Sequence, residues 1–547
     1  MRKNEQGQEI ESEPMTAIEM PDNVVVVLLD SLNRHMLGSY GGSEFATPNL
    51  DRFAAQSARF TNHVTGSLPC MPARHDLLVG SLDFLWKPWG SIELWEEPIT
   101  ATLRHAGVVS MLVTDHPHLF ETGGENYHTD FAGWEYVRGH ESDPWKTYVD
   151  RSSIGAQTIE TEPQGWFWRR LGAPSMEPWG YDRARTFFRG EADYPGPKTM
   201  KATAQWLRYG AAQHTESGQR WFCLVDEFDP HEPFDVSPEW VGRYDDVPIE
   251  GPRLIWPPYI DGGRSKGLLN EAESHQIRGN YGAKLSMIDH WFGEILRAFD
   301  DGNLWESTAL IVCTDHGHYL GEEREGRDVW GKPRVPQFEP LGHVPLFIHW
   351  PKAASKPEIS ALTTTVDLHA TLCDVFGVTP QHATHGSSLV PLLTGQATSI
   401  RDWAIGGVYG CWVQVTDGQR KYARAPEGNG FPLSMWSNRW SSMPVHVPGI
   451  VNLPKPDERA WLDRMPGSTV PVIRQPFAPG DLLPMWAGTE RIVGRHHAYD
   501  LGVDPDEQEN RASRAEKVER ELVDLLQAAL RSVEAPGEQF VRLGLSL

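Results

Sequence analysis

Acidic residues end two apolar runs of the sequence and are the first candidates for chemistry. Asp30 follows "VVVVLL" at residues 24–29, and Asp315 and His316 end "ALIVCTDH" at residues 309–316. If both runs are buried strands of one parallel sheet, their carboxyl ends meet at the edge where such sheets bind ligands. Two carboxylates and an imidazole at that edge would suit a divalent cation. The alternative is that each acid caps a helix or pairs with an arginine.

A second candidate is the segment "SLPCMPAR", which contains one of the five cysteines of the chain. Pro72 favours the first turn of a helix, so Cys70 is expected at or near the N-terminus of that helix. The helix dipole and the free N–H groups there favour a negatively charged atom, and Arg74, one turn on, adds a positive charge. This arrangement would suit an anionic nucleophile beside an oxyanion-binding corner. The alternative is a buried structural cysteine.

The elements that must position these residues alternate along the chain. Apolar runs predict strands at residues 24–29, 108–115, 220–229, 309–316 and 344–350, and helical patterns occupy 47–58, a stretch from about 72, and 275–299. Thr47 and Pro48 fit the N-cap and first turn of the first helix. This alternation predicts an α/β fold with a mostly parallel central sheet flanked by helices. Asp115 and Asp229 end two more of these strands and are ligand candidates by position alone.

Composition and patterning divide the chain into a disordered lead-in at residues 1–22, a larger α/β domain at 23–395 and a smaller C-terminal domain at 396–547. Residues 141–197 are rich in Pro, Gly and Trp and are predicted to be an insertion or a lid. Asp417-Gly418 lies between strand-like runs and predicts a hairpin. The C-terminal domain is therefore expected to be α+β with an antiparallel sheet, closed by a helix at residues 514–533.

The 22 tryptophans allow two interpretations. Packing in cores and interfaces explains most tryptophans in globular proteins. A substrate cleft lined by aromatic rings is the alternative, because four tryptophans crowd the Pro/Gly-rich segment: Trp145, Trp166, Trp168 and Trp179.

Charge and cysteine content narrow the functional class. The net charge of −24 disfavours nucleic acid or an anionic membrane as the main partner. No CxxC pair occurs, which disfavours a disulfide framework or a zinc knuckle, and Cys313 and Cys373 lie in apolar runs that predict buried, inert thiols. The N-terminal residues show no hydrophobic signal segment, so a cytoplasmic location is expected by default. The oligomeric state stays open.

The pattern C-x-P-x-R, here from Cys70 to Arg74, resembles the signature of the type I sulfatases of the alkaline phosphatase superfamily. Other segments resemble that family in the same order along the chain. They are "VVVVLLDSLNRHMLGSYGG", "ATPNLDRFAAQSARFTNHV", "DPHEPF", "TDHGHYLGE", "GK" followed by "HVPLFIHWP", "HGSSLVPLLTG" and "AYDLGVDPDEQENRA". The resemblance covers most of the chain and implies an alkaline-phosphatase-like α/β domain with a smaller C-terminal α+β domain.

The resemblance also implies a role for each matching residue. A maturation enzyme would oxidise Cys70 to formylglycine, whose hydrate attacks sulfur or phosphorus. One divalent metal ion would be held by the modified Cys70 with Asp30, Asp315 and His316. Arg74 would orient the diol. Lys332 and His231 would contact oxygens of the substrate, with His231 as the acid for the leaving group, and His343 would also line the site.

Three departures from the family pattern bear on substrate and metal. Ser31 stands where most sulfatases have a second acid. The "GKWHLG" segment of the family is replaced by "TDHPHLFETGGENY", in which Thr114, His116 and His118 are candidate substitutes, His116 first. His316 stands where sulfatases usually have asparagine, and the Asp-His pair resembles phosphonate monoester hydrolases. An imidazole suits Mn²⁺ better than Ca²⁺, so either ion is possible.

The sequence thus predicts a hydrolase that cleaves a small-molecule sulfate monoester. The nearest alternative keeps the same residues and acts on a phosphonate monoester or phosphodiester. Two further alternatives are a non-catalytic relative that binds an anionic sugar, and a transferase that passes the group to another alcohol. The leaving group cannot be predicted from the residues.

Overall fold

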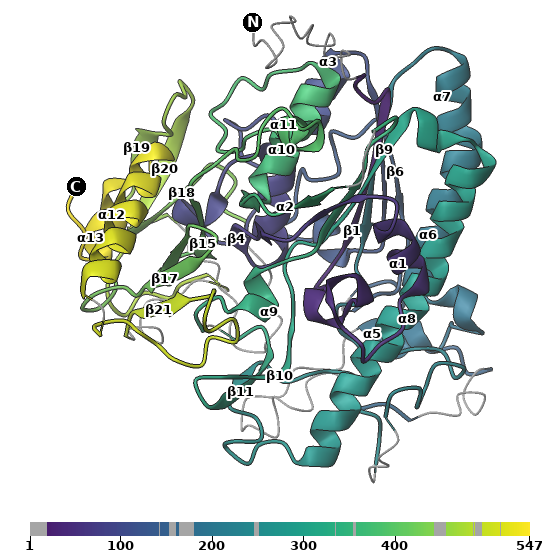
Figure 1. Ribbon diagram of the computed structural model, residues 1–547, viewed down its shortest axis with the longest axis horizontal. Coiled ribbons are helices and arrows are strands. Elements are labelled where there is room, and N and C mark those ends of the chain that lie inside the picture. Colours follow the sequence, from purple (N-terminus) through teal and green to yellow (C-terminus); the bar gives the residue numbers. More distant parts are fainter. Residues whose placement is uncertain are drawn as a thin grey trace, which may run out of the picture.

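A central eight-stranded sheet organises the larger part of the chain (Figure 1). The computed structural model describes residues 19–141, 143–152, 160–162, 180–245, 251–333, 335–353, 357–441, 456–484, 486, 495–514 and 516–547. The strand order is β13-β2-β12-β9-β1-β7-β5-β6, with bounds Glu358–Ile359, Ala58–Phe60, Leu346–His349, Thr308–Cys313, Asn23–Leu29, Trp221–Glu227, Val109–Thr114 and Gly133–Tyr136. Strands β9, β1, β7, β5 and β6 are parallel, whereas β12 is antiparallel to both β9 and β2. The predicted α/β fold with a mostly parallel sheet is confirmed.

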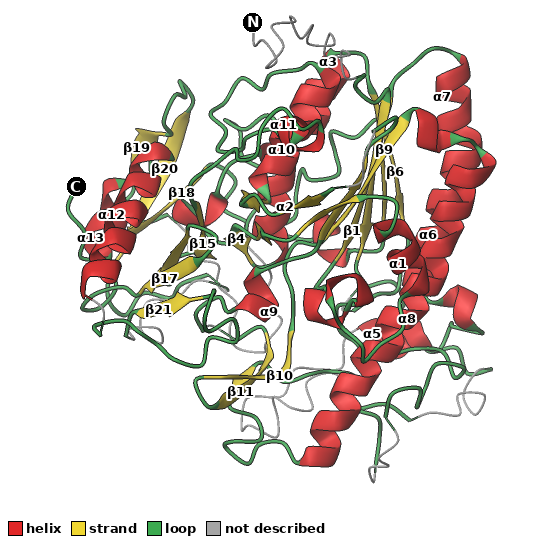
Figure 2. Ribbon diagram, in the orientation of Figure 1, coloured by secondary structure: helices red, strands yellow, loops and turns green. Residues whose placement is uncertain are grey.

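Helices cover both faces of this sheet because β1 is apolar on both sides (Figure 2). Val24, Val26 and Leu28 pack into one buried cluster and their neighbours in the sequence pack into another. The first cluster includes residues of α2 (Cys70–Val79), α3 (Ile99–His105) and α10 (Val366–Phe376). The second includes residues of α1 (Pro48–Ala54), α6 (Pro195–Trp206) and α8 (Glu271–Asp301).

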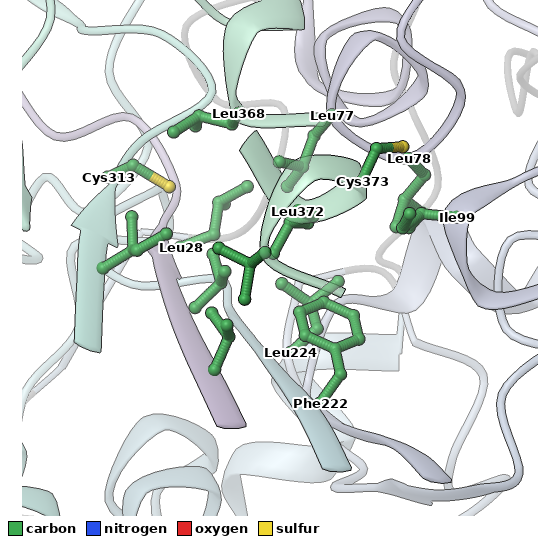
Figure 3. Close-up of a cluster of buried hydrophobic side chains, with 14 of the residues drawn as sticks. Leu28, Leu77, Leu78, Ile99, Phe222, Leu224, Cys313, Leu368, Leu372 and Cys373 are labelled. Atoms are coloured by element: carbon green, nitrogen blue, oxygen red, sulfur yellow. The ribbon is translucent and has the colours of Figure 1, made fainter. Parts of the chain in front are cut away.

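The first cluster contains three of the cysteines, Cys70, Cys313 and Cys373. Figure 3 shows Cys313 beside Leu28 of β1, and Cys373 near Leu78 and Ile99. Both thiols are buried, as the sequence predicts. This layer matters for the site because it anchors the underside of α2, whose first residue is Cys70.

One helix boundary agrees with the predictions and one differs. Helix α2 begins at Cys70, so Cys70 lies at the N-terminus of the helix as predicted, with Pro72 in its first turn. Helix α1 ends at Ala54, well before the predicted residue 58, because Ala58 already belongs to β2. Thr47 is the N-cap residue of α1, but its side chain makes no capping hydrogen bond. The carboxylate of Asp289 on α8 accepts the free N–H groups of α1 residues 49 and 50 instead, at 3.1 and 2.7 Å.

The C-terminal part contains two smaller sheets. The first has the order β21-β17-β16-β15-β4, with bounds His497–Asp500, Arg420–Arg424, Val413–Thr416, Ala404–Val408 and Ser67–Leu68. The second has the order β18-β20-β19, with bounds Leu433–Ser437, Pro471–Phe477 and Trp461–Arg464. The predicted hairpin is confirmed, because β16 and β17 pair antiparallel around Gly418, which has a φ of +90°. Helices α12 (Glu516–Ser532) and α13 (Gly537–Arg542) cover this part (Figure 1).

Strand β4 links the two parts of the molecule. It precedes Cys70 directly, yet it pairs in parallel with β15 of the C-terminal sheet, Ser67 opposite Gly407 and Leu68 opposite Val408. The remaining elements are short or lie at the periphery: β3 (His63–Val64), β8 (Ile260–Asp261), β10 (Tyr319–Arg324), β11 (Arg327–Gly331), β14 (Thr363–Thr364), α5 (Gly180–Arg185), α7 (Ala212–Glu216), α9 (Glu339–Gly342) and α11 (Val390–Leu393).

Parts of three sequence predictions fall outside the described residues. These are residues 1–18 of the lead-in, residues 153–159 and 163–179 of the predicted insertion, and Trp166, Trp168 and Trp179. Trp145 is described, and its ring lies 5.7 Å from that of Phe187. Within the described ranges, every helix is too short or too polar to cross a lipid bilayer.

Candidate active site

The ends of two neighbouring strands bring the predicted metal ligands together. Strands β1 and β9 pair in parallel, so Asp30 and Asp315 emerge side by side at the carboxyl edge of the sheet. Asp30, Cys70, Asp315 and His316 each place one ligand atom within 4.8 Å of the others, and all four are buried. We refer to these four residues as the Cys70 cluster. The predicted ligands therefore meet in one place.

Cys70 occupies the first residue of α2 and points into this cluster. Its Sγ lies 3.2 Å from His316 Nε2 and 3.9 Å from Lys332 Nζ. Burial, reinforced by Asp30, raises the pKa of the thiol well above its ordinary value. An unmodified Cys70 is therefore a protonated thiol at neutral pH, which is a poor nucleophile.

His316 is oriented to offer Nε2 as a ligand. Its Nδ1 lies 2.8 Å from the carbonyl oxygen of Gly317, and this contact fixes the tautomer with the proton on Nδ1. Burial lowers the pKa of His316 to about 4, so the ring is neutral at physiological pH. A neutral imidazole with an unprotonated Nε2 is the form that binds metal ions.

Arg74 lies at the centre of the carboxylates. One of its Nη atoms lies 2.8 Å from Asp315 Oδ2, and the other lies 2.9 Å from Asp30 Oδ2 and 2.7 Å from Asp226 Oδ1. Nε also donates to Asp226, which makes that ion pair bidentate. The Arg74 guanidinium therefore holds three buried carboxylates in fixed positions.

Asp226 is a residue of the site that the sequence reasoning missed. It stands opposite Leu28 in the pairing of β7 with β1, one position before the strand end. The prediction chose Asp229, the last acid of the segment "RWFCLVDEFD". Asp226 is the first acid of that segment and follows its apolar residues directly. The first acid after an apolar run is also the rule that identifies Asp30 and Asp315, so that signal could have found it.

The two buried carboxylates of the cluster differ in how well their charge is balanced. Burial and the nearby Asp315 raise the pKa of Asp30 well above its usual range. Asp30 Oδ2 has no hydrogen-bond partner among the described residues, although Arg74 lies beside it. Burial also opposes the charge of Asp315, but His316 and Arg74 outweigh it and lower its pKa. A divalent cation between these oxygens and His316 Nε2 would satisfy the unpartnered oxygen.

Ser31 takes the place of the second acid and has a different role. Its Oγ donates to Asp30 Oδ1 at 2.7 Å and accepts from Lys332 Nζ at 3.3 Å. Its backbone N–H donates to Asp315 Oδ1 at 3.1 Å. The residue has a φ of +63°, a strained conformation for a residue with a side chain. Ser31 therefore connects Lys332 to the cluster and fixes both acids.

The three candidate substitutes for the "GKWHLG" segment have different surroundings. His116 Nε2 lies 3.8 Å from Asp30 Oδ2, and neither ring nitrogen has a hydrogen-bond partner among the described residues. Thr114 is held at the end of β5, where its Oγ1 donates to the backbone of Asp226. His118 is bound on both sides by Glu121 and Glu141. Only His116 of the three directly approaches the Cys70 cluster.

Lys332 contacts the cluster, His231 interacts with Lys332, and His343 lies elsewhere. The His231 ring stacks on Phe228 at 4.2 Å, and its Nδ1 lies 2.7 Å from the backbone oxygen of Glu232. Burial and the Lys332 charge lower the pKa of His231 well below its usual value. His343 instead contacts Arg34, Glu339 at 2.5 Å and the Thr61 carbonyl at 2.7 Å.

Asp115 and Asp229 do not join the cluster either. Asp115 accepts a hydrogen bond from the backbone of Phe228. Asp229 lies 2.7 Å from both Lys284 Nζ and His140 Nε2. Their positions at strand ends are as predicted, but their carboxylates serve a neighbouring polar network.

A narrow cavity reaches His316 and Lys332 from outside. Its volume is about 20 Å³, and its walls are Leu68, Pro69, Pro333, Leu341, Val408, Trp412 and Trp486. Three of these residues belong to the C-terminal part of the chain. Apart from His316 and Lys332, the walls of this cavity are therefore apolar or aromatic.

Known proteins resemble this chain over most of its length. The sulfatase family model matches residues 22–378, a span that contains the whole Cys70 cluster. A choline-sulfatase from Rhizobium meliloti (strain 1021) is 25% identical over 431 residues, which cover 73% of this chain and 77% of that protein. The iduronate 2-sulfatase of Homo sapiens is 25% identical over 366 residues, 61% of this chain and 61% of that protein.

Solved structures show the same fold at low identity. A phosphonate monoester hydrolase from Agrobacterium radiobacter superposes with a TM-score of 0.60 at 16% identity, over 94% of this chain and 96% of that chain. A 2-O GAG sulfatase gives a TM-score of 0.57 at 16% identity, over 94% of this chain and 93% of that chain. These likenesses show the architecture of the molecule.

Proposed function

Because the chain belongs to the sulfatase family, we propose that it hydrolyses a small-molecule sulfate monoester at the Cys70 cluster. One observation carries the proposal. Cys70 begins α2 with Arg74 one turn further along, and its Sγ lies 3.2 Å from His316 Nε2 and 3.9 Å from Lys332 Nζ. The C-terminal sheet supports this position through β4, which ends two residues before Cys70.

The residues present fit a divalent metal ion, as the family implies. Asp30, Asp315 and His316 would hold it, because they offer a carboxylate oxygen without a hydrogen-bond partner among the described residues, a second carboxylate and an unprotonated Nε2. Such an ion would act as a Lewis acid toward the ester and lower the pKa of a bound nucleophile. The imidazole in this donor set favours Mn²⁺ over Ca²⁺, which prefers oxygen ligands only.

The position of residue 70 fits a modified side chain better than a thiol. The raised pKa of Cys70 keeps the sulfur protonated, whereas a formylglycine hydrate would supply an oxygen nucleophile. A formylglycine-generating enzyme would then be a required partner. Arg74 would fix the first turn of α2, because one of its Nη atoms lies 3.2 Å from the Cys70 carbonyl oxygen.

Lys332 and His231 would bind the ester group. Burial opposes the Lys332 charge, but the negative groups around it outweigh burial and raise its pKa, so the ammonium persists and can neutralise substrate oxygens. His231 is neutral in the absence of substrate, because burial and Lys332 lower its pKa. An anionic ester beside His231 would favour its protonated form, which is the form that can donate to a leaving group.

A phosphonate monoester or phosphodiester is the second candidate substrate. Two features favour it. One is the Asp315-His316 pair. The other is Ser31, because it stands where most sulfatases have a second carboxylate. Sulfate monoesters and phosphonate monoesters both carry a single negative charge, so the charge of the site does not discriminate between them. Discrimination would rest on how Lys332, His231 and His116 contact the oxygens.

Paired substrates with one leaving group test the proposal. We expect kcat/KM for 4-nitrophenyl sulfate to exceed that for 4-nitrophenyl phenylphosphonate, and both to be lost in a Cys70→Ala variant. A higher kcat/KM for the phosphonate would establish the second candidate. Hydrolysis of neither would support a non-catalytic role, and ester products formed with added alcohols would reveal a transferase.

A further inference from the structure

A second group of metal-ligand side chains lies on the other side of α2. It consists of His75 on α2, Asp83 at the start of a short 3-10 helix (Asp83–Leu85) and Glu96 just before α3. One ligand atom of each lies within 4.8 Å of the others. His75 is 1% and Asp83 3% exposed, and the Glu96 side chain is 5% exposed. We call these three residues the His75 triad.

Each carboxylate of the triad divides its oxygens between Lys87 and His75. Lys87 Nζ lies 3.6 Å from Asp83 Oδ1 and 3.6 Å from Glu96 Oε2. The other oxygens face the imidazole, with Glu96 Oε1 2.9 Å from Nε2 and Asp83 Oδ2 4.0 Å from Nδ1. The hydrogen bond of Lys87 goes instead to the Ser91 carbonyl, at 2.6 Å. The lysine therefore leaves one oxygen of each acid available to a cation.

One buried oxygen of the triad lacks the partner that burial demands. Asp83 Oδ2 has no hydrogen-bond partner among the described residues. His75 Nδ1 lies 3.2 Å from the Ser81 carbonyl, and Nε2 faces Glu96 Oε1, another member of the triad, at 2.9 Å. An imidazole that contacts a backbone carbonyl through one nitrogen can offer the other nitrogen to a metal ion. A structural ion-pair network alone would leave Asp83 Oδ2 unsatisfied.

The triad is reachable from outside. A cavity of about 460 Å³ is lined by all three residues together with Lys87. Its opposite wall includes residues 381–383 and 465–470, so it lies between the larger and the C-terminal parts of the chain. A hydrated cation could enter there, and water could complete its coordination.

We propose that His75, Asp83 and Glu96 bind a second divalent transition-metal ion with zinc-like preferences. One imidazole and two carboxylates are a donor set that suits Zn²⁺ and leaves a position for water. The ion would tie α2, the helix that begins at Cys70, to the chain segment before α3. This site is separate from the Cys70 cluster and does not depend on the proposed function.

Metal stoichiometry tests the proposal. Tag-free protein is stripped with chelator, saturated with Zn²⁺, desalted, and its zinc measured per chain by mass spectrometry. The wild type should hold two ions, Asp83→Asn and Glu96→Gln one, and Asp30→Asn one. Glu97→Gln is the matched control, because Glu97 lines the same cavity outside the triad, and it should hold two. The same zinc content in Asp83→Asn as in the wild type would overturn the proposal.

A Lys87→Met variant tests the site without removing a proposed ligand, so the test still applies if the acid variants fail to fold. Removing the ammonium beside the triad should tighten zinc binding there about tenfold or more, because a like charge near the ion is lost. The melting temperature of this variant should therefore rise more on zinc addition than that of the wild type. If the group is an ion-pair network only, Lys87→Met will be destabilised and zinc will not restore it, which contradicts the proposal.

Discussion

At the scale of single residues, Arg74 explains why so many buried charges can share one site. Its guanidinium contacts Asp30, Asp226 and Asp315 at once, with distances of 2.7 to 2.9 Å. A lysine could not reproduce this, because an ammonium is a point charge without the planar fork of five donors. The carboxylates in turn hold Arg74 against the first turn of α2. The geometry at Cys70 therefore depends on a residue that is buried beneath it.

Arg74→Lys should reduce kcat by about 100-fold, because the carboxylates and the first turn of α2 lose their common fork of donors. Aryl sulfate hydrolysis and metal content measure the effect. Arg52→Lys is the control, since Arg52 is half exposed and pairs with Asp300 at the surface. Wild-type kcat in Arg74→Lys would show that Arg74 does not organise the site.

His118 should make stability depend on pH. Burial lowers its pKa, but Glu121 and Glu141 outweigh burial and raise it to about 10. Because the folded pKa exceeds the unfolded value, the stabilisation is complete below about pH 6.5 and is lost as pH rises toward 10. His118→Gln should therefore cost about 3 kcal/mol near pH 6 and progressively less toward pH 10.

Urea unfolding of the wild type and His118→Gln at pH 6, 8 and 10 measures this difference. His105→Gln serves as the control, because His105 is 74% exposed and should contribute little at any pH. A His118→Gln difference that stays constant from pH 6 to pH 10 would contradict the charged state assigned to His118.

At the scale of elements, the first two turns of α2 are held in place by strand β4, which precedes the helix. Strand β4 joins the C-terminal sheet just before Cys70, and the Asp76 carboxylate on α2 returns to accept Ser67 N–H and Oγ–H, both at 2.7 Å. Asp83 N–H donates to the same Ser67 Oγ at 3.0 Å. Strand β15 approaches closely, because a Cβ at Gly406 would lie 2.6 Å from the Gly66 carbonyl oxygen.

Gly406→Ala should therefore weaken the site although residue 406 is far from Cys70 in sequence. The added methyl meets backbone atoms that cannot easily move, so we expect a loss of about 1–3 kcal/mol in unfolding free energy and a lower kcat. Gly190→Ala is the control, since a Cβ there meets nothing within 4 Å. Thermal unfolding and hydrolysis assays compare the two variants. Unchanged activity in Gly406→Ala would show that β15 does not position α2.

At the scale of the whole molecule, the sheet supplies the charges and the C-terminal part supplies the apolar walls. Val408, Trp412 and Trp486 line the narrow cavity that reaches His316 and Lys332. The Trp486 ring lies 6.2 Å from that of Tyr259, near Lys332. We expect such rings to contact the leaving group of an ester and not the ester oxygens.

Trp486→Ala should raise KM for an aryl sulfate about fivefold with a smaller change in kcat, because aromatic contacts contribute about 1 kcal/mol. Trp461→Ala is the control, since Trp461 is exposed at 45% on β19. Steady-state kinetics separate the two parameters. A fivefold loss of kcat with no change of KM would instead show that Trp486 acts on the chemistry of the ester group.

The sequence predicts the sheet and the ligands at its edge because both follow from local pattern. Apolar runs end where Asp30 and Asp315 begin, and the hairpin at Gly418 is equally local. The reversed direction of β12, the pairing of β4 with β15 and the capping of α1 by Asp289 depend on contacts between distant segments. The His75 triad was missed for the same reason, because its members share no motif.

The central claim is that residue 70 is made into formylglycine and acts as the nucleophile. Trypsin should release residues 60–74 as one peptide, since Arg59 and Arg74 flank it. In active protein from the native organism, the peptide mass should show the side chain CH₂SH replaced by CHO. Cysteine retained quantitatively at residue 70 in fully active protein would contradict the account.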